Sequence, residues 1–180
     1  LYTNYIITAA ISQIMKGGFI MKWFTNPKTL EELKKQYKQF AMKYHPDRGG
    51  NLKDMQEINA EYDELFKRLK NVHATTDGKY YNQETTETKN EFKNIIDKLI
   101  NLNINIEICG SWVWVTGNTY SYRDTLKGLK FRFSSSKKAW YYHADGYRKS
   151  SRKSYTLDEI RDLYGSETVT QKPHLKLSII

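Results

Sequence analysis

The chain has 180 residues, enough for one domain or two small ones, and its 27% charged and 14% aromatic residues are typical of a globular protein. A net charge of +9 indicates an acidic partner. Cys109 is the only cysteine, which excludes an intrachain disulfide and gives no sign of an oxidising compartment. The four histidines lack the spacing of metal ligands, so we expect neither a metal nor another cofactor.

Residues 1–20 contain an apolar stretch, Ile6 to Met15, that polar side chains interrupt. The stretch is too short to span a membrane and lacks the basic start of a signal peptide, so we expect a cytoplasmic protein without a membrane segment. Lys16-Gly17-Gly18 can be encoded by a ribosome-binding sequence a short distance before the codon of Met21. We therefore expect translation to start at Met21 and residues 1–20 to be an upstream extension. The alternative is a genuine amphipathic N-terminal helix.

A helical pattern follows from about Leu30 to His45. Thr29 with Glu32 three residues later is typical of a capping box, and Pro46 disfavours helical geometry at the residue before it. The apolar residues form one stripe of an amphipathic helix: Leu30, Leu33, Tyr37, Phe40, Ala41 and Tyr44. The polar face of this helix carries four lysines: Lys34, Lys35, Lys38 and Lys43.

A second helical stripe begins after Asn51, which suits an N-cap. Its apolar residues repeat the spacing of the first: Met55, Ile58, Tyr62, Leu65, Phe66 and Leu69. Two such helices joined by a short Pro/Gly loop form an antiparallel hairpin. The tripeptide His45-Pro46-Asp47 would then lie exposed at the tip, beside the basic helix face, where a rigid loop suits recognition.

These residues resemble the J-domain of DnaJ-type co-chaperones. The similarity covers Met21 to about Lys70 and rests on the run Tyr37-Lys38-x-x-Ala41-x-x-Tyr44-His45-Pro46-Asp47, followed by Ile58-Asn59, Tyr62 and Leu65. The Gly49-Gly50 pair and the short first segment, with Trp23 and Phe24 expected to pack on the hairpin, are more similar to viral and mobile-element J-domains. Two features depart from the family: Glu61 stands where the family often has Ala, and the family's Lys-Arg-x-x-Tyr-Asp ending is absent.

The resemblance implies a mechanism and a set of site residues. A J-domain docks on an ATP-bound DnaK-type chaperone, its basic helix meets an acidic surface of the ATPase domain, and its His-Pro-Asp tip favours the state that hydrolyses ATP. The residues that would bind the chaperone are His45, Pro46, Asp47, Arg48, Tyr37, Lys34 and Lys38. The alternative is a chance His-Pro-Asp in a helical hairpin whose lysines are a solvated face.

The polar residues 74–88 predict a linker between a J-domain over 21–73 and an α+β module over 89–165, which a tail over 166–180 follows. A third helical stripe covers about 84–101, and period-two alternation then predicts two antiparallel hairpins. We expect their strands at 104–108, 111–116, 129–133 and 139–143, a short helix at 120–126 and a capped helix at 156–164. The expected fold class is α+β: an N-terminal all-α helical hairpin, then a small α+β domain with two antiparallel β-hairpins.

Most of the positive charge lies in the second module. Ten basic residues stand between Arg123 and Lys153 against Asp124 and Asp145, and aromatic residues such as Phe133 alternate with them. Such a face can hold phosphates and stack bases, so nucleic acid is a possible partner. The candidate contact residues are Arg132, Lys137, Lys138, Trp140, Tyr142, Arg148 and Lys149. The alternative is that the aromatic rings fill the core of a small sheet domain while the charges are solvated.

No catalytic constellation is evident. Ser111 and Ser134 to Ser136 have no recognisable His/Asp context, and His143 beside Asp145 is typical of a turn, so we expect no enzyme. The second module resembles a module of uncharacterised proteins from Firmicutes, their phages and mobile elements, on the pattern Gly-Ser-Trp-Val-Trp-Val-x-Gly-Asn-Thr and the later Lys-Lys-Ala-Trp-Tyr-Tyr. Three functions remain open: a J-domain co-chaperone that recruits a DnaK-type chaperone, a nucleic-acid-binding adaptor of a phage or mobile element, and a module that binds a client protein.

Overall fold

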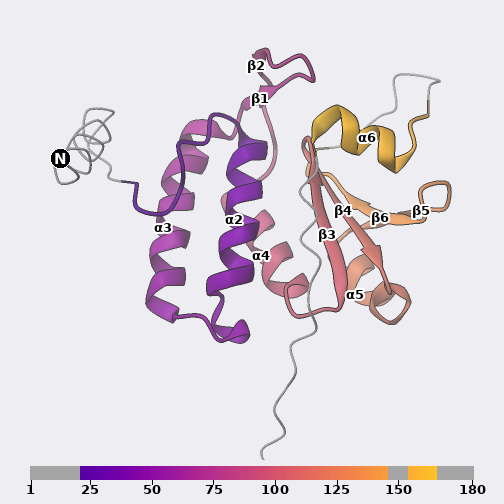
Figure 1. The fold of residues 1–180 in the computed structure, drawn as a ribbon, viewed down its shortest axis with the longest axis horizontal. Helices are drawn as coiled ribbons and strands as arrows, with labels where there is room; N and C mark the ends of the chain where they lie inside the picture. Colours follow the sequence, from indigo (N-terminus) through magenta and orange to yellow (C-terminus); the bar gives the residue numbers. More distant parts are fainter. Residues whose placement is uncertain (1–20, 146–153, 166–180) are drawn as a thin grey trace, which may run out of the picture.

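The computed structural model describes residues 21–145 and 154–165, which form helices and two antiparallel sheets (Figure 1). The α+β fold class is confirmed. A helical hairpin lies on one side, a single helix lies in the middle, and a four-stranded sheet lies on the other side (Figure 1). Within the described residues, no helix is long and apolar enough to cross a membrane.

The hairpin consists of α2 (Leu30–Tyr44) and α3 (Leu52–Leu69). Thr29 caps α2, since its hydroxyl accepts a hydrogen bond from the amide of Glu32 at 3.2 Å. In a capping box the Glu32 carboxylate would accept a hydrogen bond from the amide of Thr29. Here it accepts one from the amide of Lys28 at 2.8 Å, so only half of the expected capping box is present. The predicted apolar stripes of both helices face each other in the core.

Glu61 anchors the short segment before α2. Its carboxylate accepts hydrogen bonds from the backbone amides of Lys22, Trp23 and Phe24 at 3.0, 3.1 and 2.9 Å. The Phe24 ring is buried and lies 5.1 Å from the ring of Phe40, so the segment packs on the hairpin as expected. The residue that departs from the family pattern therefore has a structural role, because a buried carboxylate must be satisfied by donors of this kind.

The expected linker is partly ordered. A short strand at its start, β1 (Val72–Ala74), pairs with β2 (Tyr80–Asn82) in an antiparallel hairpin. The buried His73 side chain belongs to β1, and its Nδ1 lies 2.6 Å from the Glu31 carboxylate at the start of α2. Glu87 is buried as well. The segment predicted as a linker over 74–88 is therefore attached to the helical hairpin by strand pairing and by these buried polar contacts.

The second part of the chain begins with α4 (Lys89–Leu99), which is shorter than the stripe predicted. Four strands follow: β3 (Ile104–Cys109), β4 (Trp112–Gly117), β5 (Arg132–Ser134) and β6 (Ala139–Tyr142). Both predicted hairpins are present, and antiparallel pairing of β4 with β6 joins them into one sheet of order β3-β4-β6-β5. A 3-10 turn (Tyr120–Tyr122) and α5 (Arg123–Gly128) connect β4 to β5.

The two faces of the sheet have different neighbours. Val113, Val115 and Trp140 face α4 and join the main core, whereas Cys109 and Trp114 face α6 (Leu157–Tyr164). The division follows from the alternation of side chains along each strand. The capping box predicted for α6 is present, with Thr156 and Glu159 as its partners.

The helical hairpin and the sheet share one core. The rings of Tyr37 and Tyr62 lie 5.9 and 6.3 Å from the ring of Phe92 on α4. One continuous cluster of buried residues then runs from Phe24 to Tyr142. The two predicted modules are therefore packed against each other through α4.

Candidate functional site

The loop between α2 and α3 has a defined geometry. His45 is extended and ends α2, and Pro46–Arg48 form one turn of 3-10 helix. The amide of Asp47 donates a hydrogen bond to Nδ1 of His45 at 3.2 Å. Gly49 then takes φ of 85°, in the left-handed region that favours glycine. The loop therefore has a specific backbone conformation that this hydrogen bond and the glycine support.

Gly50 is required for a second reason. A Cβ at this position would lie 2.0 Å from the backbone oxygen of Tyr44, which is closer than any side chain can approach. The loop therefore packs directly on the last turn of α2. This contact sets the direction in which α3 leaves the loop.

The predicted exposure of the tip holds for Asp47, whose side chain is 62% exposed, but not for His45. The His45 side chain is only 14% exposed, and its Nε2 lies 3.5 Å from the carboxylate of Asp97 on α4. The Asp47 carboxylate accepts a hydrogen bond from Nδ2 of Asn101 at 3.1 Å. Partial burial raises the pKa of the Asp97 carboxyl, and the nearby His45 and Lys93 oppose that shift.

Arg48 continues this contact. Its guanidinium donates to the backbone oxygen of Ile100 at 2.9 Å and to that of Met42 at 3.1 Å. Pro46 is half-buried at the start of the 3-10 turn. His45 and Arg48 therefore lie against the C-terminal end of α4, whereas the Asp47 side chain is still 62% exposed.

The lysines expected to form a basic docking face are mostly engaged within the chain. Lys34 and Lys38 are each 2% exposed. Lys34 forms an ion pair with Glu87, and the Lys38 ammonium donates to the backbone oxygen of Ile106 on β3 at 3.0 Å. The prediction that these two residues lie on an open surface is wrong, because α4 and β3 cover this side of α2.

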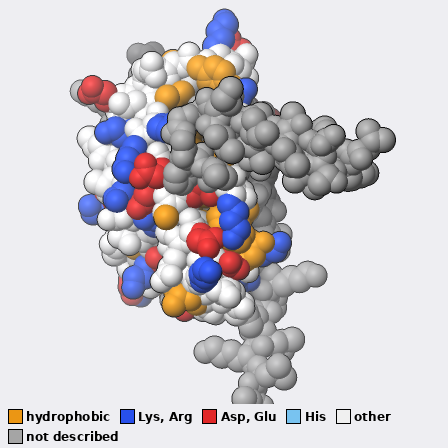
Figure 2. Space-filling model, turned by 90° about the vertical axis from the view of Figure 1, so that its left-hand side faces the viewer, with side chains coloured by type: hydrophobic (Ala, Val, Ile, Leu, Met, Phe, Trp, Pro, Cys, Tyr) orange, Lys and Arg blue, Asp and Glu red, His pale blue; other side chains and the backbone are white. Residues whose placement is uncertain are grey.

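The remaining two lysines of the expected basic face and the candidate docking tyrosine also lie on α2. Lys35 donates to the backbone oxygens of Tyr164 and Gly165 at 3.3 and 2.8 Å. Lys43 is exposed. Tyr37 is buried, and its hydroxyl donates to Oδ1 of Asn59 at 2.9 Å, so it joins α2 to α3 instead of facing a partner. On the outer face of the hairpin, basic and acidic side chains are interspersed (Figure 2).

The residues proposed for nucleic acid divide into two groups. Trp140 and Tyr142 are buried in the main core, so neither ring can stack on a base, and this part of the prediction is wrong. The reason is strand alternation, which points both rings at α4. Arg132 and Lys138 are exposed and Lys137 is half-buried. Arg148 and Lys149 lie outside the described residues.

Exposed aromatic surface is present nearby. Phe133 on the edge strand β5 is 52% exposed, although its ring also lies 5.4 Å from that of Trp140. It stands between Arg132 and Ser134, and Lys138 is across the β5–β6 turn. This edge therefore combines cationic and aromatic groups, on a smaller scale than the sequence suggested.

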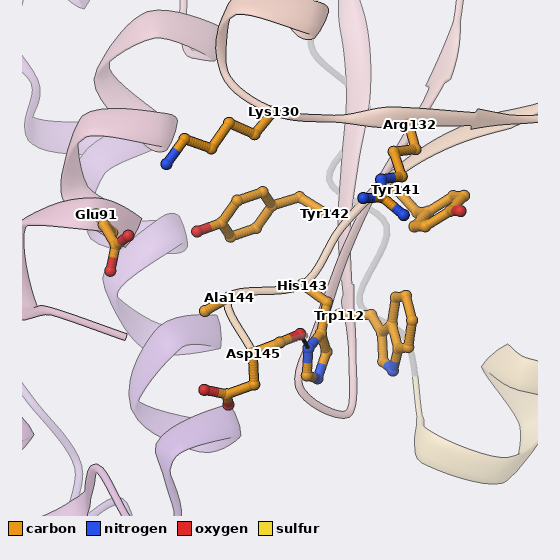
Figure 3. A pocket seen from close by; sticks show the side chains of 9 residues that line it. All are labelled: Glu91, Trp112, Lys130, Arg132, Tyr141, Tyr142, His143, Ala144 and Asp145. Atoms are coloured by element: carbon orange, nitrogen blue, oxygen red, sulfur yellow. Dashed lines mark hydrogen bonds between the residues drawn. The ribbon is translucent and has the colours of Figure 1, made fainter. Parts of the chain in front are cut away.

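A pocket of about 300 Å³ opens between α4 and the end of β6 (Figure 3). Glu91, Lys130 and Tyr142 approach one another on one side, and Trp112 and His143 lie together on the other (Figure 3). Burial raises the pKa of the Tyr142 hydroxyl, and the negative charges of Glu91 and Glu87 add to the shift. The pocket wall is mixed in charge, which does not select for anions alone.

Ser111 does have a histidine partner, contrary to the prediction. Its hydroxyl lies 2.8 Å from Nε2 of His143, and Nδ1 of His143 lies 2.6 Å from the backbone oxygen of Asp145. Because that carbonyl only accepts, Nδ1 carries the proton and Nε2 accepts from the serine. The contact joins the β3–β4 turn to the end of β6, which lies 32 residues further along the chain, so no local motif could reveal it.

The Asp145 carboxylate serves a structural role. Although burial alone would raise its pKa, hydrogen bonds from the Thr86 amide and from the Thr85 and Thr86 hydroxyls hold the pKa of this group below its usual range. These bonds attach the segment before α4 to the sheet. Within residues 21–145 and 154–165, no cluster of three or more potential metal ligands is present.

No protein-family model, curated protein or solved structure matches this chain.

Sequence reasoning missed the groups that hold α2 and its tip. These groups are the carboxylates of Glu87 and Asp97, the amide of Asn101, and backbone oxygens of residues 100, 106, 164 and 165. Glu87 and Asp97 lie in polar surroundings that predict solvated side chains. Backbone oxygens carry no sequence signal at all.

Proposed function

We propose that this protein is a co-chaperone that binds a DnaK-type chaperone in the cytoplasm and stimulates its ATP hydrolysis through His45-Pro46-Asp47. The observation that carries the proposal is the loop at the end of two antiparallel helices, in which Nδ1 of His45 holds the amide of Asp47. The second module would bring the chaperone to a target. The protein itself would catalyse no reaction.

The loop geometry supports this function more than a chance motif does. A turn that only connects two helices needs neither a histidine acceptor nor two glycines in strained or close-packed positions. The extended His45 and the 3-10 turn after it keep the side chains of His45 and Asp47 on the same side, towards α4. Such preorganisation lowers the entropy lost when a partner binds.

Single-turnover ATP hydrolysis by a DnaK-type chaperone tests the proposal. The full chain, added over a wide concentration range, is expected to raise the hydrolysis rate, and His45→Gln is expected to abolish the effect. Lys53→Gln is a matched control, because Lys53 is exposed at the start of α3 near the loop but belongs to no proposed contact. Equal stimulation by His45→Gln and wild type would refute the proposal.

Nucleic-acid binding is the second candidate, favoured by one specific observation. Phe133 is exposed on an edge strand, with the exposed Lys138 in the adjoining turn and the exposed Arg132 on the opposite face of the same strand. A ring next to cations can stack a base while the cations neutralise phosphates. Retention of the full chain on single-stranded DNA or RNA that falls steeply with salt would support this candidate, and the absence of retention at low ionic strength would remove it.

A further inference from the structure

We infer that the second module holds the helical hairpin in a closed state that hides its chaperone-docking face, so that docking requires the release of this module. The inference rests on the proposed function and adds a mechanism of regulation to it. Its basis is a set of contacts between the proposed docking residues and residues 87–165.

Most of the proposed docking residues contact the second part of the chain, although Tyr37 binds Asn59 on α3 and Arg48 also binds Met42. Lys34 pairs with Glu87, Lys38 with the backbone oxygen of Ile106, and Arg48 with that of Ile100. At the tip, Asp97 approaches His45 and Asn101 binds Asp47. Lys35 is held by the backbone oxygens at the end of α6. Apart from Asn59 and Met42, these partners lie in the second part of the chain, although α2 is also next to α3.

The groups that cover the docking residues have the same chemistry as the acidic partner that would replace them. Lysine and arginine are bound by carboxylates and carbonyl oxygens, which is how an acidic protein surface would bind them. Glu87 and Asp97 thus stand in for an acidic surface. An external chaperone and the second module cannot occupy this face of α2 together, because Lys34 and Lys38 are already 2% exposed.

The helical hairpin and the second module are connected at a segment where they could separate. Ile96 and Leu99 on α4 belong to the buried core that α4 shares with the helical hairpin and the sheet, and Asp145 attaches Thr85 and Thr86 to the end of β6. The segment that crosses from the β1–β2 hairpin to these threonines is exposed at residues 82–84. In the proposed open state the sheet, α4 and the attached threonines move away from α2 and α3, which separates Phe92 from Tyr37 and Tyr62 and also breaks the polar contacts.

Release has a measurable consequence. If only a fraction of the molecules is open, the apparent dissociation constant for the chaperone is the intrinsic one divided by that fraction. An open population of about 0.1–10% would weaken apparent binding by about 10- to 1,000-fold. A variant that opens the chain should thus shift the concentration for half-maximal stimulation and leave the maximal rate unchanged.

Two opening variants of the full chain test the inference. Asp97→Lys replaces the carboxylate beside His45 with a cation, and the side chain of Asp97 is 46% exposed, so the variant should fold. Glu87→Gln combined with Asp97→Lys also leaves the Lys34 ammonium without its ion-pair partner, which favours an arrangement in which water reaches it. Glu84→Lys is the matched control for Asp97→Lys, because it makes the same charge change at an exposed position three residues before Glu87.

Two readouts are needed. The first is the concentration of protein that gives half-maximal stimulation of single-turnover ATP hydrolysis, which should fall at least about 10-fold in the opening variants and stay unchanged in Glu84→Lys. The second is the rate at which an amine-reactive reagent labels Lys34 and Lys38 relative to the exposed Lys43, followed by mass spectrometry. Labelling of the two buried lysines should be slow in wild type and faster in the opening variants. Adding His45→Gln to an opening variant should abolish stimulation.

The outcomes separate this inference from the proposed function. Wild type that stimulates as strongly as an opened variant would overturn the inference and leave the co-chaperone function standing. Labelling of Lys34 and Lys38 as fast as Lys43 in wild type would also overturn it. An opened variant that labels rapidly but never stimulates hydrolysis would refute the co-chaperone function itself, and the inference with it. If the double variant unfolds, Asp97→Lys alone decides the question.

Discussion

The ammonium of Lys34 on α2 is ion-paired with the carboxylate of Glu87, 53 residues further along the chain, and both side chains are 2% exposed. The ammonium also lies 5.3 Å from the centre of the Phe92 ring. A buried pair of this kind costs desolvation energy when it forms, but removing one partner leaves an uncompensated charge. Removing one partner of this pair is therefore expected to destabilise the protein much more than replacing both partners with apolar residues.

Glu87→Ala is expected to lower the free energy of unfolding by about 3–5 kcal/mol, because it leaves the Lys34 ammonium buried and unpaired. Lys34→Met combined with Glu87→Leu should be neutral, or stabilising by about 1–4 kcal/mol, because both charges are gone. Denaturant unfolding of Lys34→Met, Glu87→Leu and the double variant measures the coupling. Additive losses in the double variant would show that the two side chains do not interact.

Gly50→Ala is expected to disrupt the His-Pro-Asp loop, because its Cβ would collide with the backbone oxygen of Tyr44. Gly49→Ala is the matched control. Open space surrounds that position, and the cost there is only the left-handed backbone, about 1–2 kcal/mol. Chemical denaturation should find Gly50→Ala clearly less stable than Gly49→Ala. Equal stability of the two variants would contradict the close packing of the loop on α2.

The His73–Glu31 contact should make stability depend on pH at both ends. The hydrogen bond to Glu31 raises the pKa of His73, so the stability that it contributes is complete below pH 6.5 and is lost as pH rises through the higher folded-state pKa. Burial alone would raise the pKa of Glu31, but the hydrogen bond with His73 lowers it overall. Its contribution is therefore complete above pH 4.5 and is lost as pH falls through the lower folded-state pKa.

Stability from this pair should thus be greatest between pH 4.5 and 6.5. Unfolding free energies of wild type and His73→Gln, measured from pH 4 to pH 9, test the alkaline side. Relative to wild type, the variant should lose most stability in acid and progressively less as the pH rises. A difference that stays constant across this range would show that the ring does not change its charge on folding.

Phe133 and Trp140 are paired across β5 and β6, but alanine substitutions at the two positions should affect stability differently. Trp140→Ala removes a core ring and should cost about 3–5 kcal/mol of stability. Phe133→Ala changes an exposed ring and should alter stability by no more than about 0.5 kcal/mol. If the β5 edge binds single-stranded nucleic acid, Phe133→Ala should weaken binding by about 1–3 kcal/mol for the stacked base. Unchanged binding by Phe133→Ala would remove this ring from the interface.

The elements of this fold follow closely from local sequence. The helical stripe and N-cap at Thr29, the capping box of Thr156 with Glu159 and the alternation around Trp112 and Trp114 each predict an element that the structure contains. Short-range signals suffice here because caps and periodicity act over only a few residues. The same locality explains why the attachment of residues 74–88 to the helical hairpin was not predicted, since strand pairing and the His73–Glu31 contact order this polar segment.

The sequence alone determined that there would be a helical hairpin with His45-Pro46-Asp47 at its tip and a sheet of two hairpins after it. Only the tertiary structure decided which side chains face solvent. Lysines at Lys34 and Lys38 look solvated from periodicity, and Trp140 looks as able to point outwards as Phe133. Their burial depends on α4 and β3 packing on α2 and on which face of the sheet α4 covers. Such contacts join residues more than 50 positions apart, and their polar partners are often backbone oxygens, which every residue has alike.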